Sequence, residues 1–261
     1  MIPKIIHYCW FGGNPIPEKD KKCIESWRKF CPDYEIREWN ESNYDVTKSS
    51  YMAQAYQAKK WGFVPDYARL DIIYEYGGIY LDTDVELIRP IDELLSEEAF
   101  MGFETVRRVA PGLGFGAIPH HPMIGELRDR IYGERVFCKE DGTLDLTASP
   151  ELNTDILNEK GLQPNNEKQV VGGITIYPME YFCPMDFISK KIDLTDHTYS
   201  IHHYNGSWLT EEETFRTEVR AKLCRIMPKR AAQHISKLIA VTKFRGIGAA
   251  VSDTSAWLKM K

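Results

Sequence analysis

Short apolar runs alternate with helical repeats along most of the chain. The run from Lys4 to Tyr8 and the period-two alternation from Tyr34 to Trp39 both predict strands. Apolar residues at helical spacing predict helices from Pro17 to Phe30 and from Asp66 to Tyr76. The same patterns predict strands at 79–81, 85–88, 99–104, 115–118, 174–177 and 199–202, and helices at 123–132 and 153–160. Strands that alternate with helices predict an α/β sheet.

The sharpest chemical feature is Asp82-Thr83-Asp84, which directly follows the apolar run Ile79-Tyr80-Leu81. Carboxylates at positions i and i+2 of a regular strand point to opposite faces, so a site that uses both requires a turn or bulge there. Mg²⁺ and Mn²⁺ prefer oxygen ligands, often carboxylates together with substrate phosphates. The pair predicts a site for a metal and a diphosphate. The alternative is a solvated strand end with two surface acids.

The pattern turns helical and basic from about Glu211 onward, and Pro228 separates two predicted helices. Residues 216–261 contain eleven Lys and Arg against two acids, a formal charge of +9, which leaves −14 on residues 1–215 for a total of −5. We expect one domain at 1–209 and a basic helical C-terminal extension at 210–261. The extension either contacts an anionic membrane surface, or is an ordinary pair of helices that packs on the acidic part of the chain and keeps its charged residues in solvent. No nucleic-acid-binding module is evident.

Composition adds few further limits. With 43% hydrophobic and 27% charged residues in 261, the chain is typical of globular proteins rather than of disordered or fibrous ones. Its six cysteines form no Cys-x-x-Cys pair, which argues against a zinc cage or a disulfide framework. The sequence shows no apolar run of about 20 residues and no secretory signal. We therefore expect a cytoplasmic protein, with peripheral contact at the inner face of a membrane if the basic helices bind lipid.

The wider context of the aspartate pair carries a family resemblance. The stretch Phe63 to Val85 contains Asp66-Tyr67-Ala68-Arg69 and then Gly77-Gly78-Ile79-Tyr80-Leu81-Asp82-Thr83-Asp84. It resembles the sugar-binding region of glycosyltransferases that contain an Asp-x-Asp motif, and specifically glycosyltransferase family 32. That family includes bacterial capsular-polysaccharide transferases and yeast initiating mannosyltransferases. The opening Ile2 to Trp10 and the later Ile201 to Trp208 fit the same pattern, so three blocks in order span most of the range 1–208 from end to end.

The resemblance implies a fold and an activity. The expected fold is α/β of GT-A type, a Rossmann-like and mostly parallel sheet with flanking helices, followed by the C-terminal helical extension. The expected reaction is metal-dependent, retaining transfer of a sugar from a UDP- or GDP-sugar to a glycan or lipid-linked acceptor. The expected role is surface or capsular polysaccharide synthesis, and the expected cofactor is Mn²⁺ or Mg²⁺.

The resemblance also implies roles in donor binding for residues between Trp10 and Tyr80. Trp10 would stack on the nucleotide base, although a buried indole would equally explain it. Asp66 and Arg69 would bind the donor sugar as catalytic residues, or form a plain intrahelical ion pair. Gly78 would permit close packing beneath the donor, or simply end a helix. Tyr80 belongs to the same substrate-binding block.

The remaining implied roles concern the metal and the diphosphate. Asp82 would contact the donor and share the metal environment, and Asp84 would be the direct metal ligand. His203 would complete the metal shell, with His202 as the second choice. Ser207 and Trp208 would close over the diphosphate. Two weaker segments, Gly112 to Ala117 and Thr147 to Thr154, are candidate acceptor loops.

Two other functions remain open on the sequence alone. Leu81 to Val85 also fits the signature of haloacid-dehalogenase-like phosphatases, with Asp82 as nucleophile and Asp84 as acid. That function requires a downstream lysine, which Lys190 to Asp196 supplies only loosely. A non-catalytic protein that binds sugar nucleotides is the second alternative, but it gives no reason for an intact metal pair.

Overall fold

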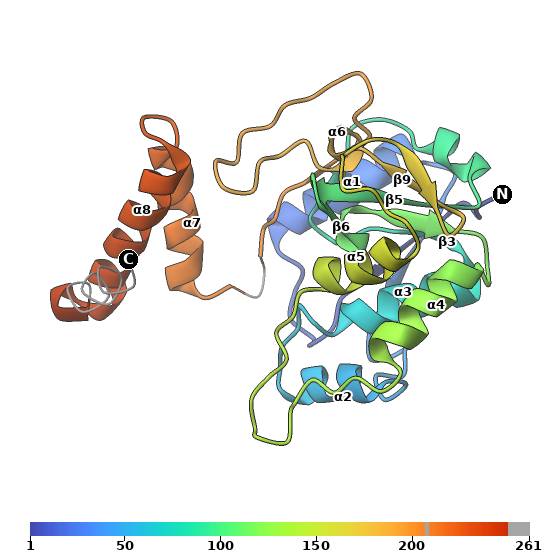
Figure 1. Ribbon diagram of the computed structural model, residues 1–261, viewed down its shortest axis with the longest axis horizontal. Coiled ribbons are helices and arrows are strands. Elements are labelled where there is room, and N and C mark those ends of the chain that lie inside the picture. Colours follow the sequence, from blue (N-terminus) through green and yellow to red (C-terminus); the bar gives the residue numbers. More distant parts are fainter. Residues whose placement is uncertain (207–208, 250–261) are drawn as a thin grey trace. The chain divides into compact units, whose positions relative to one another are not determined.

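The chain is described by a computed structural model that covers residues 1–206 and 209–249. Two compact units are present (Figure 1). The first unit contains residues 1–184 and 193–205, and the second contains Met185–Ile192 and the chain from Gly206 onward. The boundary at 209/210 stays a prediction, and the segment 185–192 belongs with the second unit although it precedes β10 in the sequence.

The first unit alternates strands and helices as the sequence pattern predicts. Its strands are β1 (Ile5–Cys9), β2 (Glu35–Trp39), β3 (Gly78–Tyr80), β4 (Val85–Leu87), β5 (Ala99–Thr105), β6 (Arg108–Val109), β7 (Phe115–Ala117), β8 (Gln169–Val171), β9 (Ile174–Tyr177) and β10 (Ser200–His202). Its helices are α1 (Glu18–Phe30), α2 (Ser50–Gln57), α3 (Pro65–Tyr76), α4 (Pro122–Tyr132), α5 (Ser149–Glu159) and α6 (Met179–Phe182), with 3₁₀ turns η1 (Asp92–Ser96) and η2 (Pro111–Leu113).

One mixed sheet organises this unit, in the order β2-β1-β3-β7-β5-β9-β8 with β6 paired to β5. Strands β2, β1, β3, β5 and β9 run in one direction, whereas β7, β8 and β6 run in the other. The sheet is therefore mostly parallel, and the predicted α/β class is confirmed. β10 and β4 form a separate antiparallel pair.

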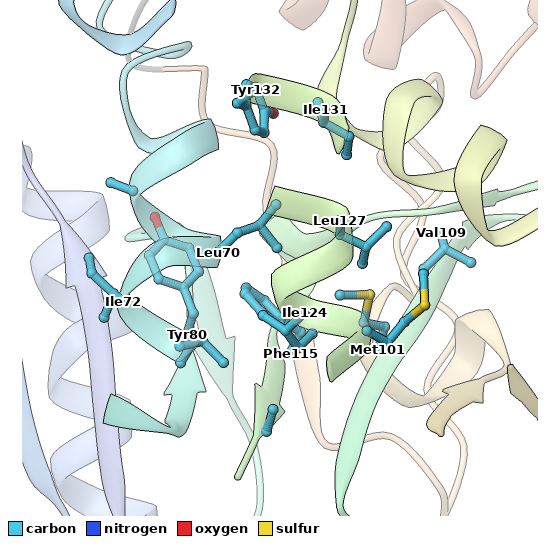
Figure 2. Close-up of a cluster of buried hydrophobic side chains, with 14 of the residues drawn as sticks. Leu70, Ile72, Tyr80, Met101, Val109, Phe115, Ile124, Leu127, Ile131 and Tyr132 are labelled. Atoms are coloured by element: carbon cyan, nitrogen blue, oxygen red, sulfur yellow. The ribbon is translucent and has the colours of Figure 1, made fainter. Parts of the chain in front are cut away.

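Side chains alternate across the sheet and feed an apolar core on each face. Tyr80 packs into the core under α3 and α4, whereas its neighbours Ile79 and Leu81 pack into the core under α1. Figure 2 shows the first of these cores, where side chains from α3, α4 and the sheet converge, among them Leu70, Ile72, Tyr80, Met101, Phe115, Ile124, Leu127 and Tyr132. The sheet is covered on both sides, so only its strand ends are available for a site.

The second unit contains the helical pair α7 (Glu211–Leu223) and α8 (Lys229–Arg245). Thr210 starts α7 with a capping box, in which its hydroxyl accepts from the backbone of Glu213 and the Glu213 carboxylate accepts in return. Pro228 precedes α8 as predicted. Among the described residues, no helix has the length and apolar character that a membrane span requires.

Most predicted elements agree with the structure to within a few residues. The sequence pattern missed α2 and the short β6, β8 and α6. The six cysteines are all free thiols, of which four are buried, while Cys138 is exposed and Cys224 is partly exposed.

Candidate active site at the ends of β1 and β3

The topology brings three sequence blocks to one edge of the sheet. β1 and β3 pair in parallel, with His7 opposite Tyr80, so the residues that follow them, Trp10 and Asp82, leave the sheet at the same edge. In open α/β sheets this carboxyl edge is where ligands bind. β7 runs antiparallel to β3, so the η2 segment before it also begins at this edge.

The turn that the Asp-x-Asp spacing required is present. β3 ends at Tyr80 and β4 begins at Val85, and the backbone N–H of Val85 donates to the carbonyl of Asp82 at 3.0 Å. This turn lets both carboxylates face one place instead of opposite faces. Together with His202 they form the one group of potential metal donors found in the described chain, with ligand atoms all within 4.8 Å of one another.

The register of β10 decides which histidine joins the aspartates. His202 lies opposite Val85 on β4, and its Nε2 is 3.1 Å from Asp84 Oδ1. His203 points its imidazole elsewhere, with Nε2 at 2.8 Å from Glu86 Oε2. Only the backbone N–H of His203 reaches the pair, donating to the carbonyl of Asp84 at 3.0 Å. The structure thus brings together Asp82, Asp84 and the second-choice His202, not His203, because successive strand residues face opposite ways.

Asp84 and His202 shift each other's pKa, and each favours the charged form of the other. Burial alone would raise the pKa of Asp84, but the His202 imidazole and the N–H of Asn205 hold it down at about 2. Burial would lower the pKa of His202, and the Asp84 carboxylate outweighs it, so that pKa is raised. Asp84 therefore carries its negative charge throughout the physiological range.

The donor set fits a hard or borderline divalent cation. Two carboxylates and one imidazole supply oxygen and nitrogen ligands of the kind that Mn²⁺ accepts. The buried Nδ1 of His202 has no hydrogen-bond partner in the part of the chain that the structure describes. The Asp82 side chain is 27% exposed, which leaves one side of the cluster open to a substrate oxygen.

Asp66 and Arg69 lie beside this cluster and are more than an intrahelical pair. Arg69 contacts Asp66 Oδ1 at 3.0 Å within α3, and its guanidinium also reaches Asp82 Oδ2 at 3.5 Å. Tyr80 completes the contact, because its hydroxyl donates to Asp82 Oδ1 at 3.1 Å. Burial raises the pKa of Asp66 to about 7 against the opposing effect of Arg69. The structure therefore connects these four predicted site residues directly.

Glycines allow the backbone to approach the cluster closely. A Cβ on Gly112 would lie 2.3 Å from Asp82 Oδ2 and 3.1 Å from the Arg69 guanidinium. Gly78 has φ +97°, and a Cβ there would lie 2.8 Å from the carbonyl of Ile5. Gly78 is buried and packs against β1, so its visible role is in strand packing.

Trp10 occupies the loop after β1. It is half-buried, and its indole Nε1 donates to the carbonyl of Asn14 at 2.6 Å. The Trp61 indole packs against Gly12 of this loop, where a Cβ would lie 2.8 Å from the indole. Ser207 and Trp208, the predicted diphosphate clamp, lie outside the described residues.

Asp20 on α1 belongs to none of the sequence motifs, although it is part of this neighbourhood. Asp20 is 1% exposed and accepts hydrogen bonds from Thr83 and Asn205. A signal was present in the pattern, because Asp20 falls at helical spacing with the buried Cys23, Ile24 and Trp27. An acid on the apolar face of an amphipathic helix indicates a polar partner inside the fold.

Comparison with known proteins gives a family match over part of the first unit. Residues 17–101 match the family described as glycosyltransferase sugar-binding region containing DXD motif. The chain is 30% identical over 162 residues to inositol phosphoceramide mannosyltransferase 1 of Schizosaccharomyces pombe, covering 57% of this chain and 49% of that protein. It is 34% identical over 117 residues to human alpha-1,4-N-acetylglucosaminyltransferase, covering 38% of this chain and 33% of that protein.

The chain thus spans half or less of the length of these curated relatives. Among solved structures, the PaToxG glycosyltransferase aligns with 61% of this chain and 70% of its own, at 22% identity and a TM-score of 0.46. The family match contains α3, the turn after β3 and both aspartates. The recognition made from the sequence motifs is confirmed: the chain carries the DXD-containing sugar-binding region of the glycosyltransferases, of the family 32 type.

Proposed function

We propose that this protein is a metal-dependent, retaining glycosyltransferase that moves a sugar from a UDP- or GDP-sugar to a glycan or lipid-linked acceptor. The observation that carries the proposal is the convergence of Asp82, Asp84 and His202 within 4.8 Å, beside the Asp66–Arg69 pair. A bound Mn²⁺ or Mg²⁺ would supply positive charge against the diphosphate as the sugar–phosphate bond breaks.

The protein's own residues orient the donor. Asp84 and His202 would hold the cation together with Asp82, which is the more exposed of the two carboxylates and would be the one nearer the donor. Arg69 and Tyr80 contact different oxygens of the Asp82 carboxylate and so fix its orientation. Asp66 and Arg69 would bind the hydroxyl groups of the donor sugar. Trp10 stacks on the base at the same sheet edge. Ser207 and Trp208 stay proposed contacts to the diphosphate.

The names of the matched relatives suggest a class of acceptor for this protein. Several matched relatives are named for mannosyl transfer to inositol phosphoceramide, a lipid, and one for N-acetylglucosaminyl transfer. For this chain we propose a lipid-linked or free glycan acceptor in surface polysaccharide synthesis, with the capsule as one such product. The family match favours this function over the haloacid-dehalogenase-like phosphatase.

Donor and metal are tested together by thermal unfolding. A panel of UDP- and GDP-sugars is added with and without Mn²⁺, and a ligand of the native state raises the Tm by mass action. We expect one donor to raise the Tm only with metal present, and Asp84→Asn to abolish that shift. Glu86→Gln is the matched control, because Glu86 lies two residues on and contacts His203 rather than the cluster. A metal-independent shift that Asp84→Asn leaves intact contradicts the metal assignment.

We further propose peripheral contact between the second unit and an anionic membrane from the cytoplasmic side. Residues 220–249 contain eight Lys and Arg and no acid. The turn between α7 and α8 exposes Ile226 to 79%, and the exposed bases Lys222, Arg225 and Arg230 flank it. An exposed isoleucine among bases is suited to a surface of anionic headgroups over acyl chains.

Vesicle sedimentation tests this contact without an enzyme assay. We expect binding to phosphatidylcholine vesicles only when phosphatidylglycerol is included. Because each base near the surface contributes about 1 kcal/mol, replacing Lys222, Arg225 and Arg230 by alanine should weaken binding about a hundredfold. Alanines at Lys59, Lys60 and Lys139, exposed bases of the first unit, are the matched control. Equal loss in both triple variants contradicts a specific membrane surface.

A further inference from the structure

Asp20 is a buried carboxylate with both oxygens engaged. Its Oδ1 accepts from the side-chain amide of Asn205 at 2.8 Å, and its Oδ2 accepts from the hydroxyl of Thr83 at 3.1 Å. No salt bridge joins Asp20 within the described ranges 1–206 and 209–249, so two neutral donors are its visible compensation. Burying a carboxylate without a cation is costly, and an alanine or leucine would suit the apolar face of α1 better.

Both partners of Asp20 are tied to Asp84. Thr83 is the middle residue of the Asp-x-Asp turn, so its side chain fixes the backbone between the two aspartates. Asn205 approaches from the segment after β10, and its backbone N–H donates to Asp84 Oδ2 at 2.8 Å. Asn205 thus donates one hydrogen bond from its side chain to Asp20 and one from its backbone to Asp84. Asp20 therefore holds the turn and the segment after His202 against each other.

Charge adds to this geometry. The negative charge of Asp84 is one of the causes that raise the pKa of Asp20, after burial and against the Asn205 hydrogen bond. Two buried carboxylates near each other repel, and a cation bound between Asp84 and His202 would relieve that repulsion.

We infer that Asp20 is a positioning residue for the metal site, which sets the orientation of Asp84 through Thr83 and Asn205. The inference rests on the proposed metal-dependent function and names a residue outside the three sequence motifs that carry the resemblance, although inside the matched region 17–101. Groups that orient metal ligands through hydrogen bonds typically contribute 10–100-fold to metal affinity. The hydrogen bonds that the described structure gives Asp20 go to Thr83 and Asn205 rather than to the three potential metal donors, so we expect its effect to be on affinity and geometry.

The central variant is Asp20→Asn, which preserves size and removes one acceptor. An asparagine has a single acceptor oxygen, so one of the two donors, Thr83 or Asn205, would face an NH₂ group instead. We expect the Kd for Mn²⁺, measured from the electron paramagnetic resonance signal of the free ion, to rise at least tenfold. Asn205→Ala should raise it similarly, and the double variant should be no weaker than the weaker single variant, because both act through one connection.

Ser26→Ala is the matched control on the same helix. The Ser26 hydroxyl accepts from the backbone N–H of Leu87 at 2.9 Å, so it also joins α1 to β4, but away from the carboxylates. We expect this variant to lower the Tm and leave the Mn²⁺ Kd unchanged. Should Asp20→Asn fail to fold, Thr83→Val removes the donor to Asp20 Oδ2 and tests the same connection from the other side.

The outcomes separate the inference from the function on which it rests. Wild-type protein that binds no Mn²⁺ overturns the metal site and the role of Asp20 together. Wild-type binding with an unchanged Kd in Asp20→Asn, whatever its Tm, overturns the inference alone and leaves the metal site in place. A raised Kd in Asp20→Asn and an unchanged one in Ser26→Ala support it.

Discussion

The guanidinium of Arg69 lies 3.5 Å from Asp82 Oδ2 and thereby joins helix α3 to the turn after β3. The same group contacts Asp66 at 3.0 Å, so a single cation faces two carboxylates. The side chains of Arg69 and Asp66 are each 7% exposed, so solvent screens this pair weakly. The proposed sugar pocket and the metal cluster are consequently coupled through one side chain.

Arg69→Met should therefore damage stability as well as activity. The change leaves Asp66 and Asp82 without their cation, and breaking a buried pair in this way costs about 3–5 kcal/mol. Urea unfolding followed by circular dichroism measures the loss. Adding Asp66→Asn to the Arg69→Met variant should recover part of it. Arg130→Met is the control, since that arginine is 42% exposed and its ion pairs contribute about 1 kcal/mol or less. Equal losses in the two single variants would contradict a coupled buried site.

Gly112→Ala should disturb the cluster without changing any charged residue. Its new methyl group would lie 2.3 Å from Asp82 Oδ2, so the carboxylate or the η2 segment must move. We expect the Mn²⁺-dependent donor shift in Tm to fall sharply. Gly248→Ala is the control, because nothing lies within 4 Å of a Cβ at that position. An undiminished donor shift in Gly112→Ala would show that Asp82 does not need its present position.

The buried His7 predicts a pH dependence of folding stability. Burial lowers its pKa to about 4, against a hydrogen bond to Gly77 that favours the charged form. Trp39 donates to Nδ1 at 3.0 Å, so the proton is on Nε2, which donates to the Gly77 carbonyl. His7 binds a proton more readily in the unfolded state than in the folded state. The contribution of the neutral, buried His7 to the free energy of unfolding is therefore complete above pH 6.5 and is lost as pH falls toward 4.

A difference measurement isolates this effect. The raised pKa of Asp66 acts with the opposite sign, because the folded state then binds the extra proton as pH falls below about 7. Comparing wild type with His7→Gln cancels the contribution of Asp66. We expect the stability advantage of wild type to shrink by up to about 3 kcal/mol between pH 7 and pH 4. A constant advantage across that range would mean that His7 does not titrate as its burial indicates.

Trp10→Ala should weaken binding of the nucleotide part of the donor. Stacking of a base on an aromatic ring contributes about 1–3 kcal/mol, which corresponds to roughly a tenfold to hundredfold change in Kd. Isothermal titration of the free nucleoside diphosphate with Mn²⁺ present measures it, and Trp10→Phe should retain part of the affinity. If both variants bind like wild type, the indole serves the loop through its contact with Asn14.

Local patterns were enough to predict most of the first unit, because its helices and strands bury clear apolar faces. Helix α2 was missed because Ser50 to Gln57 has few strongly apolar residues, although Tyr51 and Met52 are fully buried. The β6 and β8 strands are two and three residues long, too short for a periodic signal. Each pairs with the strand next to it in the sequence, β6 with β5 and β8 with β9, so the partner strand rather than a pattern of its own defines it.

The site was predictable to the extent that it is local. Asp66, Arg69, Asp82 and Asp84 come from one continuous stretch, and the structure brings them together. The choice between His202 and His203 depends on the register of β10 against β4, which no local pattern specifies. Asp20 and Gly112 enter the site through tertiary packing: the helical pattern indicates that Asp20 is buried, and the glycine segment indicates a loop at Gly112, but neither specifies the partner.

The pairing of β10 with β4 also sets an order of events during synthesis on the ribosome. The region 17–101 emerges early with Asp82 and Asp84, whereas His202 and Asn205 emerge only after the remaining strands of the sheet. A nascent chain therefore carries two of the three donors long before the third arrives. The complete group of three potential donors therefore exists only when the first unit has been translated to its end.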